Sequence, residues 1–132
     1  MWDLNIGYGS DILTTLHYYV IGDPLTLLSV FFKSSQTEFL YEFLIFLRIY
    51  LAGIAFSRYA FYHKNSKQAV FMGSMIYVFA GWTIYAAMKH PYFSNPMIYL
   101  PFILMGIDKI YKKRKKPYIF IWSVALAGLS NF

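Results

Sequence analysis

The stretch of chain from Val70 to Met88 carries no ionisable side chain other than tyrosine, and this feature constrains the fold most. A surface helix of that length in a soluble protein needs one polar face to meet water. Only 14% of all residues are charged, whereas an ordinary soluble domain carries roughly a quarter. The sequence therefore predicts an all-α protein that crosses a membrane several times, with a helix buried in a large soluble core as the alternative.

Four apolar runs have the length of a transmembrane helix or come close to it. They cover residues 37–62, 68–88, 96–111 and 117–132. The first follows Ser35 and Glu38, which have the spacing of a capping box, and it extends about 39 Å at 1.5 Å per residue. The third contains Pro101, which predicts a bend. The fourth reaches Phe132 after roughly 16 residues, fewer than the ~20 of a complete span, so we expect three complete spans and a truncated fourth.

Residues 1–36 form a different kind of segment, because glycine and proline interrupt each apolar run in it. Ser10 can cap a short helix from about residue 11 to 20, and Asp23 before Pro24 has the pattern of a second helix start. We expect both to be interfacial helices along the membrane surface, with a loop packed on the rest of the protein as the alternative. The segment lacks the basic start of a signal peptide, so we expect at least one helix upstream of it.

The positions of the lysines and arginines predict the orientation of the helices. Arg58, Lys64 and Lys67 surround one turn, and Lys109 with residues 112–116 surrounds another. Short loops rich in lysine and arginine stay in the cytoplasm. Residues 1–36 and the loop 89–95 are therefore predicted to lie together on the outer face. This pattern explains the net charge of +6 without a nucleic-acid partner, and the lack of cysteine excludes thiolate chemistry.

Arg48 is the most unusual residue of the first span. It lies about 15 Å along the helix from Glu38, near the bilayer midplane, where an arginine costs about 2.5 to 3.5 kcal/mol. Glu42 is six positions away and therefore points to a different side of the helix. Arg48 needs an acidic partner elsewhere, water in a cavity, or the phosphate of a lipid substrate. It is a candidate substrate-binding residue, with a structural ion pair as the alternative.

Three aspartates lie in the segment predicted to face outward. Asp23 is explained as a helix cap. Asp11 follows Gly7 and Gly9, which would let the backbone approach a ligand, and its carboxylate could act as a general base or hold a divalent cation. Asp3 is the other candidate base. For Asp11, stabilisation of a helix start is the alternative, and the sequence identifies no metal-ligand set.

The outer loop 89–95 supplies further candidates for substrate binding. His90 could serve as an acid, a base or a phosphate ligand, and Lys89 could stabilise a departing phosphate. Tyr92 lies in the same loop, where its ring could contact a lipid or a sugar. His17, in the other outer segment, completes the set. For each histidine, an interfacial position without a chemical role is the alternative.

Three stretches of the sequence resemble the YfhO family of bacterial membrane proteins. They are IGYGSDILTTLHYYVIGDPLTLL in the outer segment, LIFLRIYLAGIAFSRY in the first span and HPYFSNPMIYLPFILMGIDKIYKKRKKP across the third. The resemblance implies a multi-span enzyme of the GT-C type in the bacterial cell membrane. It implies transfer of a sugar from a polyprenyl-phosphate carrier to a cell-surface polymer, such as teichoic or lipoteichoic acid, on the outer face.

The resemblance also implies an essential acid in the first outer loop, in an Asp-rich stretch that this sequence lacks. We therefore expect the catalytic acid upstream of Met1, and the chain alone to be inactive. Sugar transfer from a lipid phosphate needs a base for the acceptor hydroxyl, and positive charge or a divalent cation for the phosphate. A transporter or flippase module and a non-enzymatic assembly protein are the alternatives. A polar path through several spans would favour transport, and the second span offers only small and hydroxyl-bearing polar side chains.

Overall fold

The computed structural model describes residues 2–3, 10–11, 22–89, 91–113 and 116–131. Helices dominate this part of the chain, so the expected all-α architecture is confirmed. Two strands of two residues each, β1 (Trp2–Asp3) and β2 (Ser10–Asp11), pair antiparallel near the N-terminus. The helical elements follow in the order η2 (Thr26–Phe31), η3 (Ser34–Gln36), α2 (Thr37–Tyr62), α3 (Lys67–Val78), α4 (Gly81–Lys89), η4 (Pro91–Ser94), α5 (Asn95–Lys113) and α6 (Tyr118–Asn131), where η denotes a 3-10 helix.

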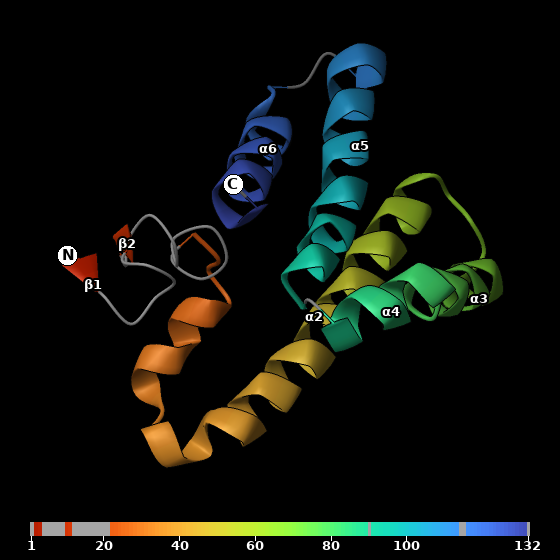
Figure 1. Cartoon of the computed structure of the whole chain (residues 1–132). Helices are drawn as coiled ribbons and strands as arrows, with labels where there is room; N and C mark the ends of the chain where they lie inside the picture. Colours follow the sequence, from red (N-terminus) through yellow and green to blue (C-terminus); the bar gives the residue numbers. More distant parts are fainter. Residues whose placement is uncertain (1, 4–9, 12–21, 90, 114–115, 132) are drawn as a thin grey trace.

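The long helix α2 packs against both α3 and α5, and α5 packs against α6 (Figure 1). α2 and α5 run in the same direction, because Arg48 contacts Asn95 near one end of the interface and His63 contacts Asp108 near the other. α3 returns antiparallel to α2, and α6 returns antiparallel to α5. The turn after α2 and the C-terminal part of α5 therefore lie at the same end of the molecule.

The start of α2 differs from the prediction made from Ser35 and Glu38. Ser35 lies inside η3, and the N-cap residue of α2 is Gln36, which makes no side-chain capping hydrogen bond. The Gln36 backbone N–H donates to the carbonyl oxygen of Lys33 at 2.9 Å. The capping-box prediction is wrong, because Ser35 belongs to this 3-10 turn and Gln36 is the N-cap residue of α2.

α2 ends in a backbone motif that uses a left-handed residue. Lys64 has a φ angle of 63°. Its N–H donates to the carbonyl of Phe61 at 2.9 Å, and the N–H of Asn65 donates to that of Ala60 at 3.3 Å. This is the Schellman arrangement, which glycine usually provides. The left-handed backbone conformation of a lysine costs about 1 kcal/mol in free energy. The two hydrogen bonds offset this cost and end α2 where the polar turn begins.

The apolar run 68–88 does not form one helix, which corrects the predicted second span. α3 ends at Val78 and α4 begins at Gly81, a residue with low helix propensity. The Thr83 hydroxyl donates to the carbonyl of Tyr77 at 3.4 Å, and an unbroken helix would bond that carbonyl to the N–H of residue 81. The side-chain bond therefore replaces a backbone bond at the break.

Among the described helices, α2 alone is long and apolar enough to cross a membrane by length and composition. The expectation of three complete spans is therefore not confirmed. α5 begins at Asn95 and continues to Lys113, and α6 is a shorter apolar helix. Ser10 and Asp11 lie in β2, and the rest of the short helix expected at 11–20 lies outside the described residues. A helical turn does follow Asp23 as η2, but it begins at Thr26 with Leu25 as its N-cap residue, rather than at Pro24.

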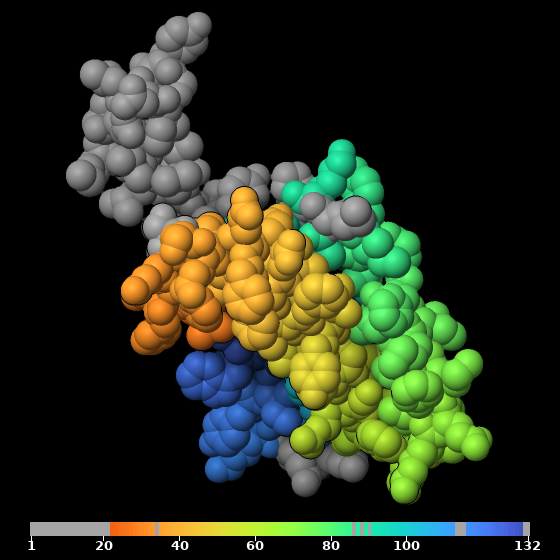
Figure 2. Space-filling model, turned by 90° about the horizontal axis from the view of Figure 1, so that it is seen from below, coloured from red at the N-terminus to blue at the C-terminus, as the bar shows by residue number. Residues whose placement is uncertain are grey.

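The interior of the helical part is small, and much of its exterior is apolar. Ala52, Val78, Ile98 and Tyr99 form a buried cluster where α2, α3 and α5 meet. Large apolar side chains cover the outside; the most exposed of them include Phe31, Phe46, Ile76 and Trp122. In Figure 2, α2 lies between α3 with α4 on one side and α6 on the other. An apolar exterior of this extent is typical of a surface that meets lipid or other protein.

Candidate functional site

The candidate site centres on Arg48, which lies in the middle of α2 and is only 2% exposed. Leu44 and Ala52, four residues before and after it, lie on the same buried face of the helix. The guanidinium donates from Nε to Oδ1 of Asn95 at 2.9 Å and from Nη2 to Oδ2 of Asp23. A buried arginine is thus paired with a buried carboxylate from the segment that precedes η2.

Asp23 accepts hydrogen bonds from four groups. Oδ1 accepts from the Leu25 backbone N–H at 3.2 Å and from Nδ2 of Asn95 at 3.1 Å. Oδ2 accepts from Arg48 and from the Thr26 hydroxyl. A carboxylate has about four acceptor positions, so Asp23 closes the local turn, as expected of a cap, and also neutralises Arg48. With its acceptor positions occupied, Asp23 is suited to hold the guanidinium of Arg48 in position.

Asn95 connects the network to α5. It is fully buried at the first residue of that helix. Its side-chain oxygen accepts from Arg48, and its side-chain amide donates to Asp23. Three segments, the turn before η2, the middle of α2 and the start of α5, therefore meet in one hydrogen-bonded cluster, which we call the Arg48 cluster (Arg48, Asp23, Asn95 and Thr26).

A pocket of about 140 Å³ adjoins the Arg48 cluster. Arg48 lines it together with five hydroxyl-bearing residues, Thr26, Ser29, Thr37, Tyr41 and Tyr92. The Nε and Nη2 atoms of Arg48 have acceptors, whereas Nη1 has no acceptor among the described residues. A guanidinium nitrogen with two unused N–H groups, beside several hydroxyls, can bind a small polar or anionic group.

Tyr92 brings a second predicted residue to this pocket. η4 places its ring centroid 5.5 Å from the guanidinium carbon of Arg48, a cation–π distance. Burial raises the pKa of the Tyr92 phenol above its ordinary value, and the positive charge of Arg48 opposes that rise. Two of the candidates chosen from sequence, one in the first span and one in the outer loop, are therefore neighbours.

The other candidates lie elsewhere or outside the described residues. Lys89, at the end of α4, places its ammonium 5.5 Å from the ring centroid of Tyr85. Asp3 and Asp11 belong to β1 and β2, where Asp3 pairs with Ser10 and Trp2 pairs with Asp11, so their backbones occupy adjacent positions of one ladder. His17 and His90 lie outside the described residues, among which no group of three or more His, Asp or Glu could hold a metal ion.

A second polar cluster joins the same two helices at their other ends. Oδ2 of Asp108 lies 3.0 Å from Nε2 of His63, and Oδ1 of Asp108 lies 3.0 Å from Nζ of Lys112, one helical turn further along α5. Tyr59 and Tyr62 pack their ring edges on the imidazole of His63. We call His63, Asp108 and Lys112 the Asp108 cluster. Its side chains are 21% to 62% exposed.

Sequence reasoning missed the partners of Arg48. Asp23 was interpreted only as a cap, and Asn95 was placed at the end of the outer loop 89–95 without a role of its own. The sequence does contain a signal, because Leu40, Leu44, Arg48 and Ala52 recur at intervals of four and so share one helix face. An alanine on that face allows another element to approach closely, which indicates that Arg48 faces protein rather than lipid.

The whole chain, residues 1–132, matches the family model described as Bacterial membrane protein YfhO. No curated protein and no solved structure matches the chain. The match agrees with the apolar exterior, with the membrane-length helix α2 and with the three stretches that resemble this family, and it implies association with the lipid bilayer. The chain therefore belongs to the YfhO family of bacterial membrane proteins.

Proposed function

We propose that the intact protein is a membrane glycosyltransferase that moves a sugar from a polyprenyl-phosphate carrier to a cell-surface polymer on the outer face. The observation that carries this proposal is the buried guanidinium of Arg48 beside a pocket of about 140 Å³, whose lining combines hydroxyl-bearing residues with Leu40, Leu44 and Pro91. A buried arginine with unused N–H groups is suited to bind a phosphate. Hydroxyl and aromatic side chains around it are suited to contact the attached sugar.

The proposed reaction assigns separate tasks to these residues. An acceptor hydroxyl attacks the anomeric carbon of the sugar, the bond from that carbon to the phosphate oxygen breaks, and polyprenyl phosphate leaves with the additional negative charge. Nη1 of Arg48 stabilises the leaving phosphate, while Asp23 and Asn95 hold the guanidinium in place. A base takes the proton of the acceptor. Asp3 and Asp11 are the proposed candidates in this chain.

Lys89, His90 and His17 are proposed to assist at the outer face, as further positive or proton-transferring groups around the donor. The proposed multi-pass topology is supported by two contacts. Arg48 joins the segments predicted to face outward, through Asp23 and Asn95. The Asp108 cluster joins the two basic turns predicted to face the cytoplasm. Each end of the molecule thus gathers segments that the charge bias assigns to one side.

The proposal is tested by measuring transfer of radiolabelled sugar from a polyprenyl-phosphate donor in membrane vesicles that contain the intact protein. The variant Arg48→Lys keeps the buried positive charge but loses the planar guanidinium with its paired N–H donors. We expect it to reduce sugar transfer by about tenfold or more. Lys67→Gln, which changes a basic residue at the start of α3, is the control and should transfer normally. Normal transfer by Arg48→Lys at equal protein level would remove the proposed role of Arg48.

One observation favours the second candidate, a transporter or flippase module. The second apolar run is broken between Val78 and Gly81, and discontinuous helices are common at the binding sites of transporters. The two functions differ in a direct assay. A flippase moves a fluorescent polyprenyl-phosphate sugar across the bilayer of a proteoliposome without an acceptor polymer, whereas a glycosyltransferase consumes the donor only when acceptor is present.

A further inference from the structure

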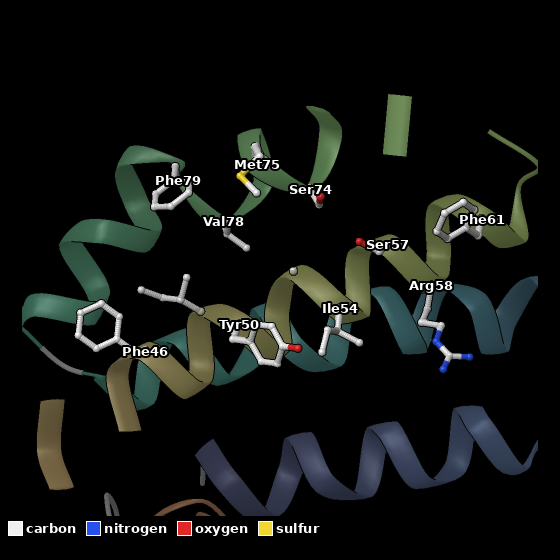
Figure 3. Close-up of a pocket in the computed structure, with 12 residues that line it drawn as sticks. Phe46, Tyr50, Ile54, Ser57, Arg58, Phe61, Ser74, Met75, Val78 and Phe79 are labelled. Carbon is white, nitrogen blue, oxygen red and sulfur yellow. The ribbon is translucent and has the colours of Figure 1, made fainter. Parts of the chain in front are cut away.

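A second pocket, of about 580 Å³, lies along α2 and α3. Most of its lining is apolar, including Phe46, Tyr50, Ile54, Phe61, Met75 and Phe79. Within the described part of the chain, Arg58 is the one charged residue that lines it. Figure 3 shows Arg58 and Phe61 toward one end of this groove, and Phe46 and Phe79 toward the other. This groove is therefore mostly apolar and has a positively charged residue near one end.

The length of the groove matches one leaflet of a bilayer. Arg58 and Phe46 are twelve residues apart on α2, which corresponds to about 18 Å at 1.5 Å per residue. The hydrocarbon of one leaflet is about 15 Å thick, half of a core of about 30 Å. Arg58 is also only one turn from the end of α2 at Tyr62. An acyl chain along the groove would place its headgroup beside Arg58.

The charges around the groove favour an anionic headgroup. Arg58 is exposed, and no carboxylate among the described residues lies within ion-pair distance of it. Lys64 and Lys67 follow in the next turn, whereas Glu38 and Glu42 lie near the opposite end of α2. A phosphate would give Arg58 the counter-charge that it lacks within the described chain.

We propose that this groove binds one acyl chain of an anionic phospholipid, with the lipid phosphate at Arg58. The site is separate from the Arg48 pocket, and it depends on the membrane location of the family rather than on the proposed sugar transfer. A neutral lipid bound without selectivity, or another segment of the protein that fills the groove, is the competing occupant. The experiment below gives a different result for each.

The intact protein is reconstituted into nanodiscs of phosphatidylcholine that contain a small fraction of a photoreactive lipid probe. The anionic probe is phosphatidylglycerol with a photoreactive acyl chain, and the neutral probe is phosphatidylcholine with the same chain. After illumination, labelled peptides are identified by mass spectrometry. We expect peptides of α2 and α3 to be labelled about fivefold more by the anionic probe than by the neutral one. Arg58→Gln should bring that ratio close to one, while Arg58→Lys and the control Glu42→Gln should retain it.

The peptide around Trp122 on α6 is the internal reference, because Trp122 is 68% exposed outside the groove. Ser57→Phe narrows the groove and should lower labelling of α2 and α3 without changing labelling around Trp122. Equal labelling by both probes in the unmodified protein means bulk lipid only and overturns the proposal. Labelling of α6 without any labelling of α2 and α3 means that another segment covers the groove, and it also overturns the proposal.

Discussion

The two polar clusters on α2 and α5 have similar chemistry and opposite surroundings. The Arg48 cluster connects the two helices through Arg48 and Asn95, with Asp23 as the counter-charge, and the Asp108 cluster connects them through His63 and Asp108. Arg48 and Asp23 are 2% and 1% exposed, whereas Asp108 and Lys112 are 21% and 62% exposed. The buried cluster has lost its water and must satisfy its charges within the protein. The exposed cluster can exchange its contacts for water at little cost.

This difference determines what each cluster can contribute. A buried ion pair is costly to form, yet removing one partner is strongly destabilising because the other charge stays buried. Such a pair is therefore a weak explanation for stability alone and a good way to fix a guanidinium in position. An exposed pair is screened by solvent and contributes little. The comparison predicts that sugar transfer depends on the Arg48 cluster, and that substitutions in the Asp108 cluster have little effect on it.

The largest effect is expected for Asp23→Asn, which leaves Arg48 buried without its counter-charge. We expect a loss of about 3 to 5 kcal/mol in the free energy of unfolding, measured by denaturation of the purified protein in mixed detergent micelles. The double variant Asp23→Leu with Arg48→Leu removes both charges and should recover most of this loss while sugar transfer stays low. If Asp23→Asn has the same free energy of unfolding as the unmodified protein, the buried ion pair is no more sensitive to loss of a partner than the exposed one.

A smaller effect is expected from Gly22, which lies beside the Arg48 cluster. A Cβ atom there would lie 1.8 Å from the backbone carbonyl oxygen of Leu129 on α6, so one backbone must move. Gly22→Ala should cost about 1 to 3 kcal/mol in the same measurement. Gly128→Ala is the matched control, because a Cβ atom there meets nothing within 4 Å. A tolerated Gly22→Ala would show that the turn before η2 can shift without loosening the buried end.

The smallest effect is expected for Asp108→Asn at the exposed end. The change removes the charge that faces His63 and Lys112. Solvent screening limits its effect on the free energy of unfolding to about 0.2 to 1 kcal/mol. Sugar transfer should be unchanged. A loss of transfer comparable to that of Arg48→Lys would show that both ends serve the reaction, and the comparison would then fail.

Much of the helical structure could be predicted because apolar runs and their polar interruptions have local causes. The run that became α2 is uninterrupted from Thr37 to Tyr62, and the polar turn after it contains Asn65 and Ser66, which caps α3. The break between Val78 and Gly81 was missed; beside it, the Thr83 hydroxyl lies 3.4 Å from the Tyr77 carbonyl oxygen and 2.9 Å from Sδ of Met97. A hydropathy pattern contains no information about such contacts.

The candidate site was predicted only in part, for a related reason. Arg48 was selected because its charge is costly in an apolar helix. Its partners, Asp23 and Asn95, are 25 and 47 residues away along the chain, and each has an adequate local explanation as a polar residue before a proline. Because the local explanation was sufficient, the sequence offered no reason to predict a contact with a distant segment. Tyr92 was named from its loop, and its position over Arg48 depends on how η4 packs against α2.

The most direct test is the affinity of the intact protein for polyprenyl phosphate, measured by isothermal titration calorimetry in detergent solution. This ligand carries the phosphate without the sugar, so it reports on the proposed role of Arg48 alone. We predict that Arg48→Lys raises the Kd by about tenfold or more, while Asp108→Asn leaves it unchanged. An unchanged Kd in a folded Arg48→Lys protein would contradict the account, because the buried guanidinium would then have only a structural role.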